Sequence, residues 1–363
     1  MQTPIDTLFM RGGTSRGPFF LETDLPPDPA TRDRVLLAVL GSPDPRQIDG
    51  LGGAHPLTSK AGIVRKSTTP GVDLDFLFVQ VQPAGDLVDS TANCGNMLAA
   101  VAPFALETGL ASAQGATTTL RVLTRNTGMQ CDMTVQTPHG RIAYEGDARI
   151  DGVPGTSAAV EIAFLDTAGS VCASLLPTGN VRDVIDGVDV TCIDNGMPLV
   201  IVRADMLGRS GYESVAELNA DTALRTRLES LRLACGHAMG LGDVSARNYP
   251  KMTLVAAPRA GGSIGTRSFI PHVCHDAIGV LAAVTVATAC MLDGSVADDV
   301  AVAPTNGGPL SVEHPGGEFS VDLDIDPANP QNVTRAALLR TARLIMRGQV
   351  MVPHSIWHKG TPT

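Results

Sequence analysis

A chain of 363 residues with a formal net charge of −10 is long enough for two domains that each bury a core of their own. The excess of acidic residues argues against a nucleic-acid-binding surface, although a few local Arg and Lys side chains can still bind an anionic small molecule. Aromatic residues make up only 4% of the chain, so aliphatic side chains must supply the core, and the 38 glycines and 25 prolines favour a strand-rich fold with many turns.

The first half begins with alternating apolar and polar residues over 3–21, which predict two strands joined by the bend RGGTSRG. Helical spacing over 29–40 precedes a loop rich in turn formers, GSPDPRQIDGLGG. The turn STANCGN then opens an apolar helix over about 96–108. Further strands are expected at 59–65, 74–82, TTLRVLTRN, CDMTVQT and GRIAYEGDARI.

Turn formers concentrate again at 154–180, and there we expect the boundary between two domains, 1–170 and 171–363. A polar turn, GTRSFIPHVCHD, leads into a second apolar helix over about 277–292, which is shorter than the ~20 residues of a membrane span. The other elements expected in this half are strands at 181–194, 198–207, 252–259, 309–317 and 318–326, helices at 214–219 and 221–240, and a final helix, NVTRAALLRTARLIMRG, followed by the strand VMVP.

Each half therefore combines several strands with one helix that is apolar on nearly all faces and must be enclosed by other structure. The simplest architecture is an α+β fold in which a bent sheet wraps around a central helix, twice over. The last helix and strand can return to the first domain in such a fold.

The N-terminus MQTPIDTLFMRGG shows no basic segment followed by an apolar one, so we expect a cytoplasmic protein with no membrane contact. The seven cysteines are scattered and include no CxxC pair, which predicts neither a disulfide framework nor a structural zinc site. Most of them are expected to be buried small apolar residues.

Cys94 differs from the other cysteines because it lies at the expected start of a helix, between Asn93 and the pair Gly95 and Asn96. The free N–H groups and the dipole of a helix N-terminus favour the thiolate form of a cysteine placed there. The two asparagines add amide donors, and the glycine allows a ligand to approach the backbone closely. The pattern predicts a nucleophile or a proton-transfer group, with a cap turn that happens to contain cysteine as the plainer alternative.

Lys60 begins an apolar strand in TSKAGIV, after a loop that contains two acids. A lysine is usually exposed at the surface, but one brought into an enclosed cleft can act as a base near neutral pH. Lys60 is therefore the second candidate for proton transfer.

Two polar segments are candidates for binding carboxylates. RGGTSRG combines Arg11, Thr14, Ser15 and Arg16 with three glycines, which suits oxyanion recognition but lacks the spacing of a phosphate-binding P-loop. The other segment, GTRSFIPHVCHD, carries Arg267, Ser268, His272 and His275. The two histidines are three apart, but no third ligand has a plausible spacing, so no metal is expected.

NCGN at the start of an apolar helix resembles the first cysteine motif of the diaminopimelate epimerase-like superfamily. In that superfamily two similar domains each wrap a sheet around a central helix, and acid–base residues face each other across the interdomain cleft. Five segments together look like one branch, the PrpF-type isomerases and 4-oxalomesaconate tautomerases: MRGGTSRGPFF, GSPDPRQIDGLGG, LTSKAGIV, NCGNMLAAVAPFALE and RSFIPHVCHDAIGV.

The chain departs from the epimerases at the second helix. The epimerases carry a second thiol in a CGTG-like turn, whereas this chain reads VCHDAIG, with no glycine after Cys274. A symmetric racemisation by two thiols is therefore not expected. In the PrpF-like branch a lysine of the TSK motif acts with the NCGN cysteine, so the resemblance implies that Lys60 and Cys94 form the acid–base pair.

The resemblance implies a cofactor-independent isomerase that tautomerises 4-oxalomesaconate, a small polycarboxylate, in the catabolism of aromatic acids such as gallate. A 1,3-allylic isomerase of 4-oxalomesaconate, aconitate or methylaconitate remains an alternative, as does a carboxylate-binding protein without catalysis. A homodimer is common in related folds. The residues expected to bind the substrate are Arg11, Thr14, Ser15, Arg16, Ser59, Asn93, Gly95, Asn96, Arg267, Ser268 and His272.

Overall fold

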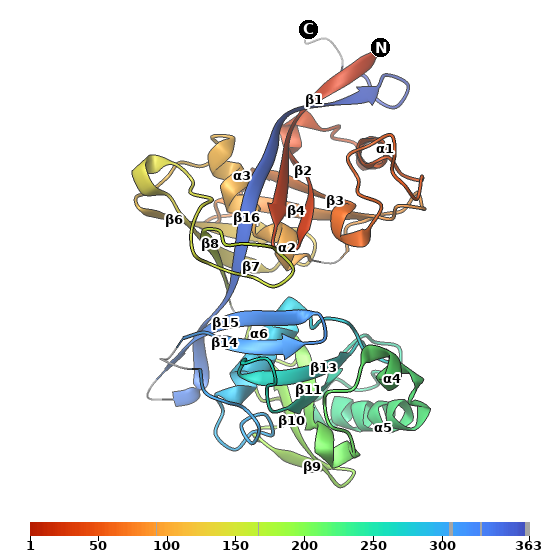
Figure 1. The fold of residues 1–363 in the computed structure, drawn as a ribbon, viewed down its shortest axis with the longest axis vertical. Helices are drawn as coiled ribbons and strands as arrows, with labels where there is room; N and C mark the ends of the chain where they lie inside the picture. Colours follow the sequence, from red (N-terminus) through yellow and green to blue (C-terminus); the bar gives the residue numbers. More distant parts are fainter. Residues whose placement is uncertain (92, 166, 305–307, 327–328, 360–363) are drawn as a thin grey trace. The chain divides into compact units, whose positions relative to one another are not determined.

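The computed structural model describes residues 1–359 apart from 92, 166, 305–307 and 327–328, and within strands it leaves the side chains of 325 and 329–332 undescribed. The chain divides into two compact units (Figure 1). The first unit comprises Met1–Ala163 and Arg340–Thr363, and the second unit comprises Phe164–Leu339.

The first unit contains the longer helix α1, two short helical segments, the strands from β1 to β8 and part of the last strand. Its elements are β1 (Gln2–Gly12), β2 (Ser15–Leu21), α1 (Pro29–Leu40), β3 (Lys60–Lys66), β4 (Leu74–Val81), β5 (Val88–Asp89), α2 (Gly95–Leu98), α3 (Val101–Glu107), β6 (Thr117–Thr124), β7 (Gln130–Gln136), β8 (Ala159–Phe164) and the second part of β16 (Asn329–Pro353), with 3-10 turns at Glu22–Asp24, Pro56–Thr58 and Pro138–Gly140.

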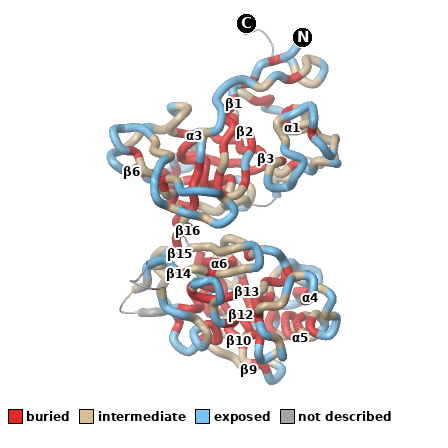
Figure 2. The backbone as a smooth tube through the Cα atoms, viewed as in Figure 1, coloured by how far each residue is buried: buried red, intermediate tan, exposed pale blue. Residues whose placement is uncertain are grey.

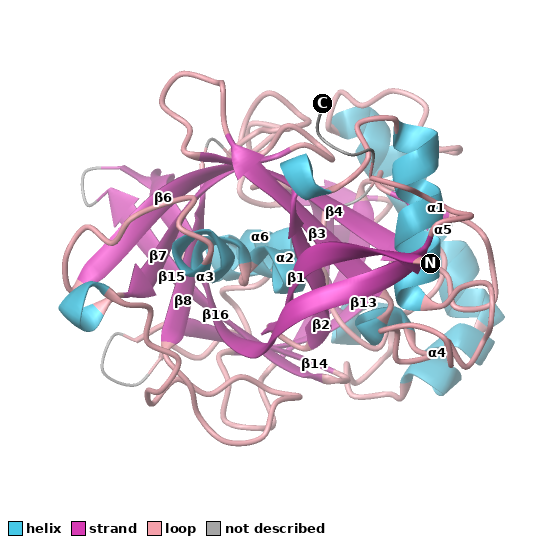
Figure 3. Ribbon diagram, turned by 90° about the horizontal axis from the view of Figure 1, so that it is seen from above, coloured by secondary structure: helices cyan, strands magenta, loops and turns pink. Residues whose placement is uncertain are grey.

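The strands of the first unit follow the order β1-β2-β3-β4-β6-β7-β8-β16, and β16 also pairs with β1, so the order closes on itself. The helices α2 and α3 lie inside these strands, because α2 contacts β1, β2, β3 and β4 and α3 contacts β3 and β7 (Figure 3). The side chains from Met97 to Ala105 are all buried, which agrees with the expected enclosed helix (Figure 2).

Strand β3 has two different faces. Ala61 and Ile63 pack in one cluster with Val35 and Leu36 of α1, which covers the outer face of the sheet. Because side chains alternate along a strand, Lys60 points to the opposite side, towards α2 and α3. The Phe19 ring, which lies 5.8 Å from the Phe104 ring of α3, marks this inner face.

The second unit repeats this plan with two outer helices. Its elements are β9 (Asp183–Ile185), β10 (Val188–Asp194), β11 (Pro198–Arg203), α4 (Val215–Ala220), α5 (Thr222–Ala238), β12 (Lys251–Ala256), β13 (Ile264–Phe269), α6 (Val280–Cys290), β14 (Leu310–His314), β15 (Gly317–Asp326) and the first part of β16, with a 3-10 turn at Ala204–Leu207. The strand order is β16-β15-β14-β13-β12-β11-β10-β9.

The apolar helix α6 occupies the inner face of this second sheet. It contacts β10, β11, β14 and β15, and every residue from Ala282 to Cys290 is buried. No helix in the described part of the chain is long and apolar enough to cross a membrane.

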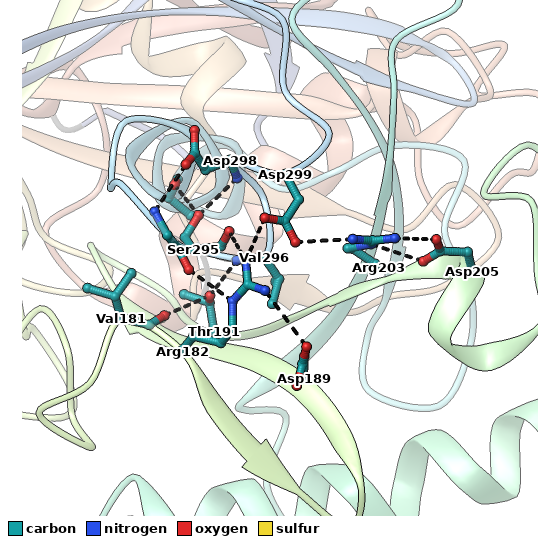
Figure 4. A network of polar contacts seen from close by, with 12 residues as sticks. Val181, Arg182, Asp189, Thr191, Arg203, Asp205, Ser295, Val296, Asp298 and Asp299 are labelled. Carbon is teal, nitrogen blue, oxygen red and sulfur yellow. Dashed lines mark hydrogen bonds and ion pairs between the residues drawn. The ribbon is translucent and has the colours of Figure 1, made fainter.

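The loop that follows α6 is held to the sheet by ion pairs and hydrogen bonds (Figure 4). Asp299 accepts hydrogen bonds from Arg182 at 2.7 Å and from Arg203, at the end of β11, at 3.1 Å. The hydroxyl of Thr191 in β10 accepts a hydrogen bond from the backbone N–H of Val296 at 3.0 Å. These contacts attach the C-terminal end of α6 to β10 and β11.

Two expectations for secondary structure are wrong. The predicted final helix, residues 332–348, is part of the 25-residue strand β16. Its Ala, Leu and Arg residues favour a helix locally, but β16 pairs with β15 at Leu338 and with β1 at Arg347, and these ladders override the local preference. The strand predicted at GRIAYEGDARI is an irregular segment in which Ala148 forms only an isolated bridge.

The close approach of β2 to β3 provides a test of the packing. A Cβ atom on Gly17 would overlap the carbonyl oxygen of Lys60, whereas a Cβ on Gly348 in β16 would meet no heavy atom within 4 Å. We expect Gly17→Ala to lower the free energy of unfolding by about 1–3 kcal/mol, because the backbone of β3 must move. Gly348→Ala, also in a strand, is the control, and equal stability of the two variants in denaturant titrations would contradict this account.

Candidate active site

The turn between β1 and β2 lies directly against the start of α2. Cβ atoms on Gly12 and Gly13 would overlap the backbone and side-chain oxygens of Asn96, and Gly13 also has a positive φ of 51°. Across this contact, the side-chain amide of Asn96 donates a hydrogen bond to the hydroxyl of Thr14 at 3.0 Å. The glycines of RGGTSRG therefore allow the hairpin and the NCGN turn to meet, and two predicted binding residues come together there.

Two further predicted binding residues have buried polar atoms without a partner in the described part of the chain: the hydroxyl of Ser15 and the side-chain oxygen of Asn93. The Asn93 amide nitrogen is used, since it donates to the hydroxyl of Thr127 at 2.5 Å. A buried polar atom without a hydrogen bond costs roughly 1–3 kcal/mol. Both atoms are therefore suited to receive a hydrogen bond from a ligand, and the hydroxyl can also donate one.

Cys94 is the N-cap residue of α2, and its carbonyl accepts a hydrogen bond from the N–H of Leu98 at 2.9 Å. Its side chain is half-buried. The other cysteines are buried except Cys172, and burial together with Asp194 raises the pKa of Cys172 to about 12. Cys94 is thus a partly accessible thiol that stands at the first turn of a central helix.

Lys60 is 8% exposed, and its Nζ donates a hydrogen bond to Oε1 of Gln80 at 2.5 Å. The same nitrogen lies 4.9 Å from the centroid of the Phe78 ring. The Gln80 amide nitrogen donates to the carbonyls of Pro56, Ser59 and Val81, which turns its oxygen towards Lys60. Lys60 is therefore oriented on the inner face of β3, the strand that α2 contacts.

The Ser59 side chain, in contrast, is occupied within the protein. It is fully buried, and its hydroxyl lies 2.8 Å from both Oε1 of Gln47 and the carbonyl of His55. These contacts support the loop before β3. The predicted role of Ser59 in binding substrate remains a prediction.

The two arginines of RGGTSRG lie in different environments. Nη1 of Arg11 donates to the carbonyls of Gly13 and Thr341, so this side chain holds the hairpin to β16. Burial, followed by the charge of Arg343, lowers the pKa of Arg11. Arg16 is exposed, and alternation puts it on the opposite face of β2 from Ser15. Their predicted binding roles also remain predictions.

The three predicted binding residues of the second half do not point to the same side of the sheet. Arg267 donates from Nε to the carbonyl of Glu213, just before α4, at 2.8 Å, and burial lowers its pKa. Nδ1 of His272 lies 3.3 Å from Oε2 of Glu229 on α5. Ser268 instead lies on the α6 side, where its hydroxyl is 3.0 Å from that of Thr253. Only Ser268 shares the inner face with the central helix.

The second central helix has no thiol at its start. Its N-cap is Gly279, whereas Cys274 lies five positions earlier in a turn where its backbone N–H and carbonyl bond to the side chain of Asn219. Burial raises the pKa of Cys274 to about 11, which keeps this thiol protonated at neutral pH. This asymmetry is consistent with the absence of a CGTG-like turn from the sequence.

No group of three or more His, Cys, Asp or Glu side chains that could hold a metal ion occurs among the residues with described positions. The structure does reveal a lysine that the sequence reasoning missed. Lys251 begins β12 on the inner face of the second sheet. In the sequence, Lys251 precedes an apolar strand in KMTLVA, as Lys60 does in KAGIV.

The accessibility of the thiols leads to a labelling prediction. At pH 8, iodoacetamide should modify Cys94 first, because Cys131, Cys192, Cys235, Cys274 and Cys290 are buried and the pKa of the half-buried Cys172 is raised to about 12. Peptide mapping by mass spectrometry after partial labelling measures the order. Earlier modification of Cys172 than of Cys94 would contradict the expected order.

Comparison with known proteins identifies the family of this chain. The PrpF protein family matches residues 2–353. The chain is 54% identical to the 4-oxalomesaconate tautomerase of Pseudomonas putida over 98% of each chain, and 54% identical to the (4E)-oxalomesaconate Delta-isomerase of a Novosphingobium species over 95% of this chain and 96% of that one. A crystal structure of methylitaconate-delta-isomerase, 33% identical, superposes with a TM-score of 0.87 and covers 100% of this chain and 99% of its own. The chain therefore belongs to the PrpF family and is an isomerase with the fold of that enzyme.

Proposed function

We propose that this protein interconverts the keto and enol forms of 4-oxalomesaconate by proton transfer that involves Lys60 and Cys94. The observation that carries the proposal is the 54% identity to the P. putida tautomerase over 98% of both chains. The buried amine of Lys60 and the N-cap thiol of Cys94, both beside α2, support the assignment of the proton-transfer groups.

The reaction moves one proton and needs no electron acceptor. One group removes the proton from the carbon next to the carbonyl, and the electron pair of the C–H bond delocalises into the carbonyl to give an enolate. Protonation of the enolate oxygen by the second group gives the enol. Lys60, held by Gln80, is our candidate for the base, and Cys94 for the partner acid, with the reverse order as the alternative.

Hydrogen-bond donors near the pair can stabilise the negative charge that develops. The Thr14 hydroxyl and the Asn96 amide meet at the start of α2, and Ser15 adds a buried hydroxyl without a partner in the described chain. Fixed donors of this kind stabilise an enolate better than mobile water does. We propose that Thr14, Ser15 and Asn96 bind carboxylate and enolate oxygens of the substrate, and that the side-chain oxygen of Asn93 accepts a hydrogen bond from its enol hydroxyl.

The physiological setting is part of the same proposal. We infer that the reaction takes place in the cytoplasm, in the catabolism of aromatic acids such as gallate, and that the protein forms a homodimer. Both similar relatives are named for 4-oxalomesaconate, a small polycarboxylate, which supports a role in the catabolism of small molecules.

A 1,3-allylic isomerase is the second candidate, and the Novosphingobium relative favours it. That Delta-isomerase is as similar to this chain as the tautomerase, at 54% identity. The same enolate would form, but protonation at the distal carbon instead of the oxygen would shift the double bond. The two reactions need the same first step and differ only in where the proton returns.

The position of deuterium in the product separates these candidates. In deuterated water, the tautomerase should interconvert the keto and enol forms and place deuterium on the carbon next to the carbonyl, as followed by NMR. A shifted double bond with deuterium on the distal carbon would identify the allylic isomerase. Absence of any exchange with 4-oxalomesaconate, cis-aconitate and trans-aconitate would overturn both.

Substitution of the pair tests the assignment of residues. Lys60→Ala and Cys94→Ser should each lower kcat by at least about 10²-fold, because a proton-transfer group is lost from the site. Lys66→Ala, which removes the exposed lysine at the other end of β3, and Cys172→Ser are matched controls expected to keep activity. Full activity in Lys60→Ala or in Cys94→Ser would remove that residue from the mechanism.

A further inference from the structure

Lys60 and Lys251 occupy equivalent positions in the two units. In the first unit the hairpin β1–β2 is followed by the outer helix α1 and then by β3, which runs parallel to β2. In the second unit the hairpin β10–β11 is followed by α4 and α5 and then by β12, which runs parallel to β11. Lys60 is the first residue of β3, and Lys251 is the first residue of β12.

Both lysines also point to the inner face of their own sheet. On β12, Met252 and Leu254 pack with Leu228 of α5 in the outer cluster. Alternation therefore turns Lys251 and Thr253 to the other side, the side of α6. A Cβ atom added to Gly279, the N-cap of α6, would lie 3.9 Å from Nζ of Lys251, which places this ammonium group beside the start of the central helix.

The surroundings of the two ammonium groups differ. Nζ of Lys60 is hydrogen-bonded to Gln80. Lys251 is half-buried, and burial lowers its pKa, yet no carboxylate or carbonyl among the described residues pairs with its Nζ. Burying part of a charged group without a partner is unfavourable. A ligand carboxylate would supply the missing negative charge.

The neighbours of Lys251 on the inner face are hydroxyl groups. Thr253, two positions along β12, and Ser268 on β13 are both buried, and their hydroxyls lie 3.0 Å apart. A lysine ammonium is a compact charge with three donors, and it binds a carboxylate well where hydroxyls provide further hydrogen bonds. The second unit thus has the side chains for one carboxylate but no thiol beside them.

We propose that Lys251 is a carboxylate-binding lysine of the second unit, whose ammonium group binds a carboxylate of the substrate beside Ser268. The assignment rests on the proposed function, since it assumes a polycarboxylate substrate. Lys60 is assigned to proton transfer in the first unit, whereas its counterpart Lys251 binds a carboxylate in the second unit. A residue of this kind acts mainly on substrate affinity.

Tricarballylate, a saturated tricarboxylate that cannot isomerise, tests the assignment without turnover. Isothermal titration calorimetry should show at least about 10-fold weaker binding to Lys251→Met than to the wild type, because a charge-assisted contact is lost. Lys251→Arg should recover most of the affinity, and Lys66→Met should bind as the wild type does. Binding of glutarate, which has one carboxylate fewer, should weaken much less in Lys251→Met.

Kinetics with 4-oxalomesaconate provide the second measurement. Lys251→Met should raise KM about 10-fold or more while kcat stays within about 3-fold, and its thermal unfolding should match the wild type. Lys251→Gln replaces Lys251→Met in both measurements if the latter does not fold.

The outcomes distinguish this inference from the proposed function. Unchanged tricarballylate binding and KM in Lys251→Met, or no binding of tricarballylate by the wild type, would overturn the role of Lys251. A wild-type protein that binds tricarballylate through Lys251 but does not turn over 4-oxalomesaconate would overturn the proposed reaction and leave the carboxylate site in place.

Discussion

The architecture of the first unit depends on backbone packed directly against backbone around α2. Gly12 packs against the backbone carbonyl of Asn96, Gly13 against the Asn96 side chain and Gly17 against the carbonyl of Lys60, so a side chain at any of these three positions would separate the hairpin from the central helix or from β3. This close packing brings three segments that are far apart in sequence to one place. The thiol of Cys94, the amine of Lys60 and the hydroxyls of the hairpin are positioned by this contact.

The second organising constraint is the two-faced sheet. Each sheet carries an outer helix layer on one face and a central helix on the other, so each strand residue belongs to one layer or the other. A shift of one residue in register would exchange the two layers. Ala61 and Met252 face the outer helices. Lys60 and Lys251 each precede one of these residues on the strand, so their side chains point to the inner face.

This constraint separates residues that look equivalent in the sequence. Arg267 and Ser268 are adjacent, yet the arginine packs near α4 and the serine faces α6. Arg16 and Ser15 separate in the same way on β2. Residue type suggested that all four could bind an oxyanion, but only the tertiary fold decides which face meets the central helix. A lysine at the head of an apolar strand is too common a pattern to identify Lys251 without a motif around it, and its equivalence to Lys60 emerges only from the order of strands and helices.

Local sequence determined much about this protein: the enclosed apolar helices, the glycine-rich bend, the thiol on the first turn of a helix and the absence of a second thiol at the other. These follow from short-range patterns of residue type, which can be read without knowing any distant contact. The tertiary structure alone decided the conformation of β16 and the faces taken by the polar residues. The Ala, Leu and Arg residues of β16 prefer a helix, but pairing with β15 and β1 supplies hydrogen bonds along the strand that outweigh a preference of less than about 1 kcal/mol per residue.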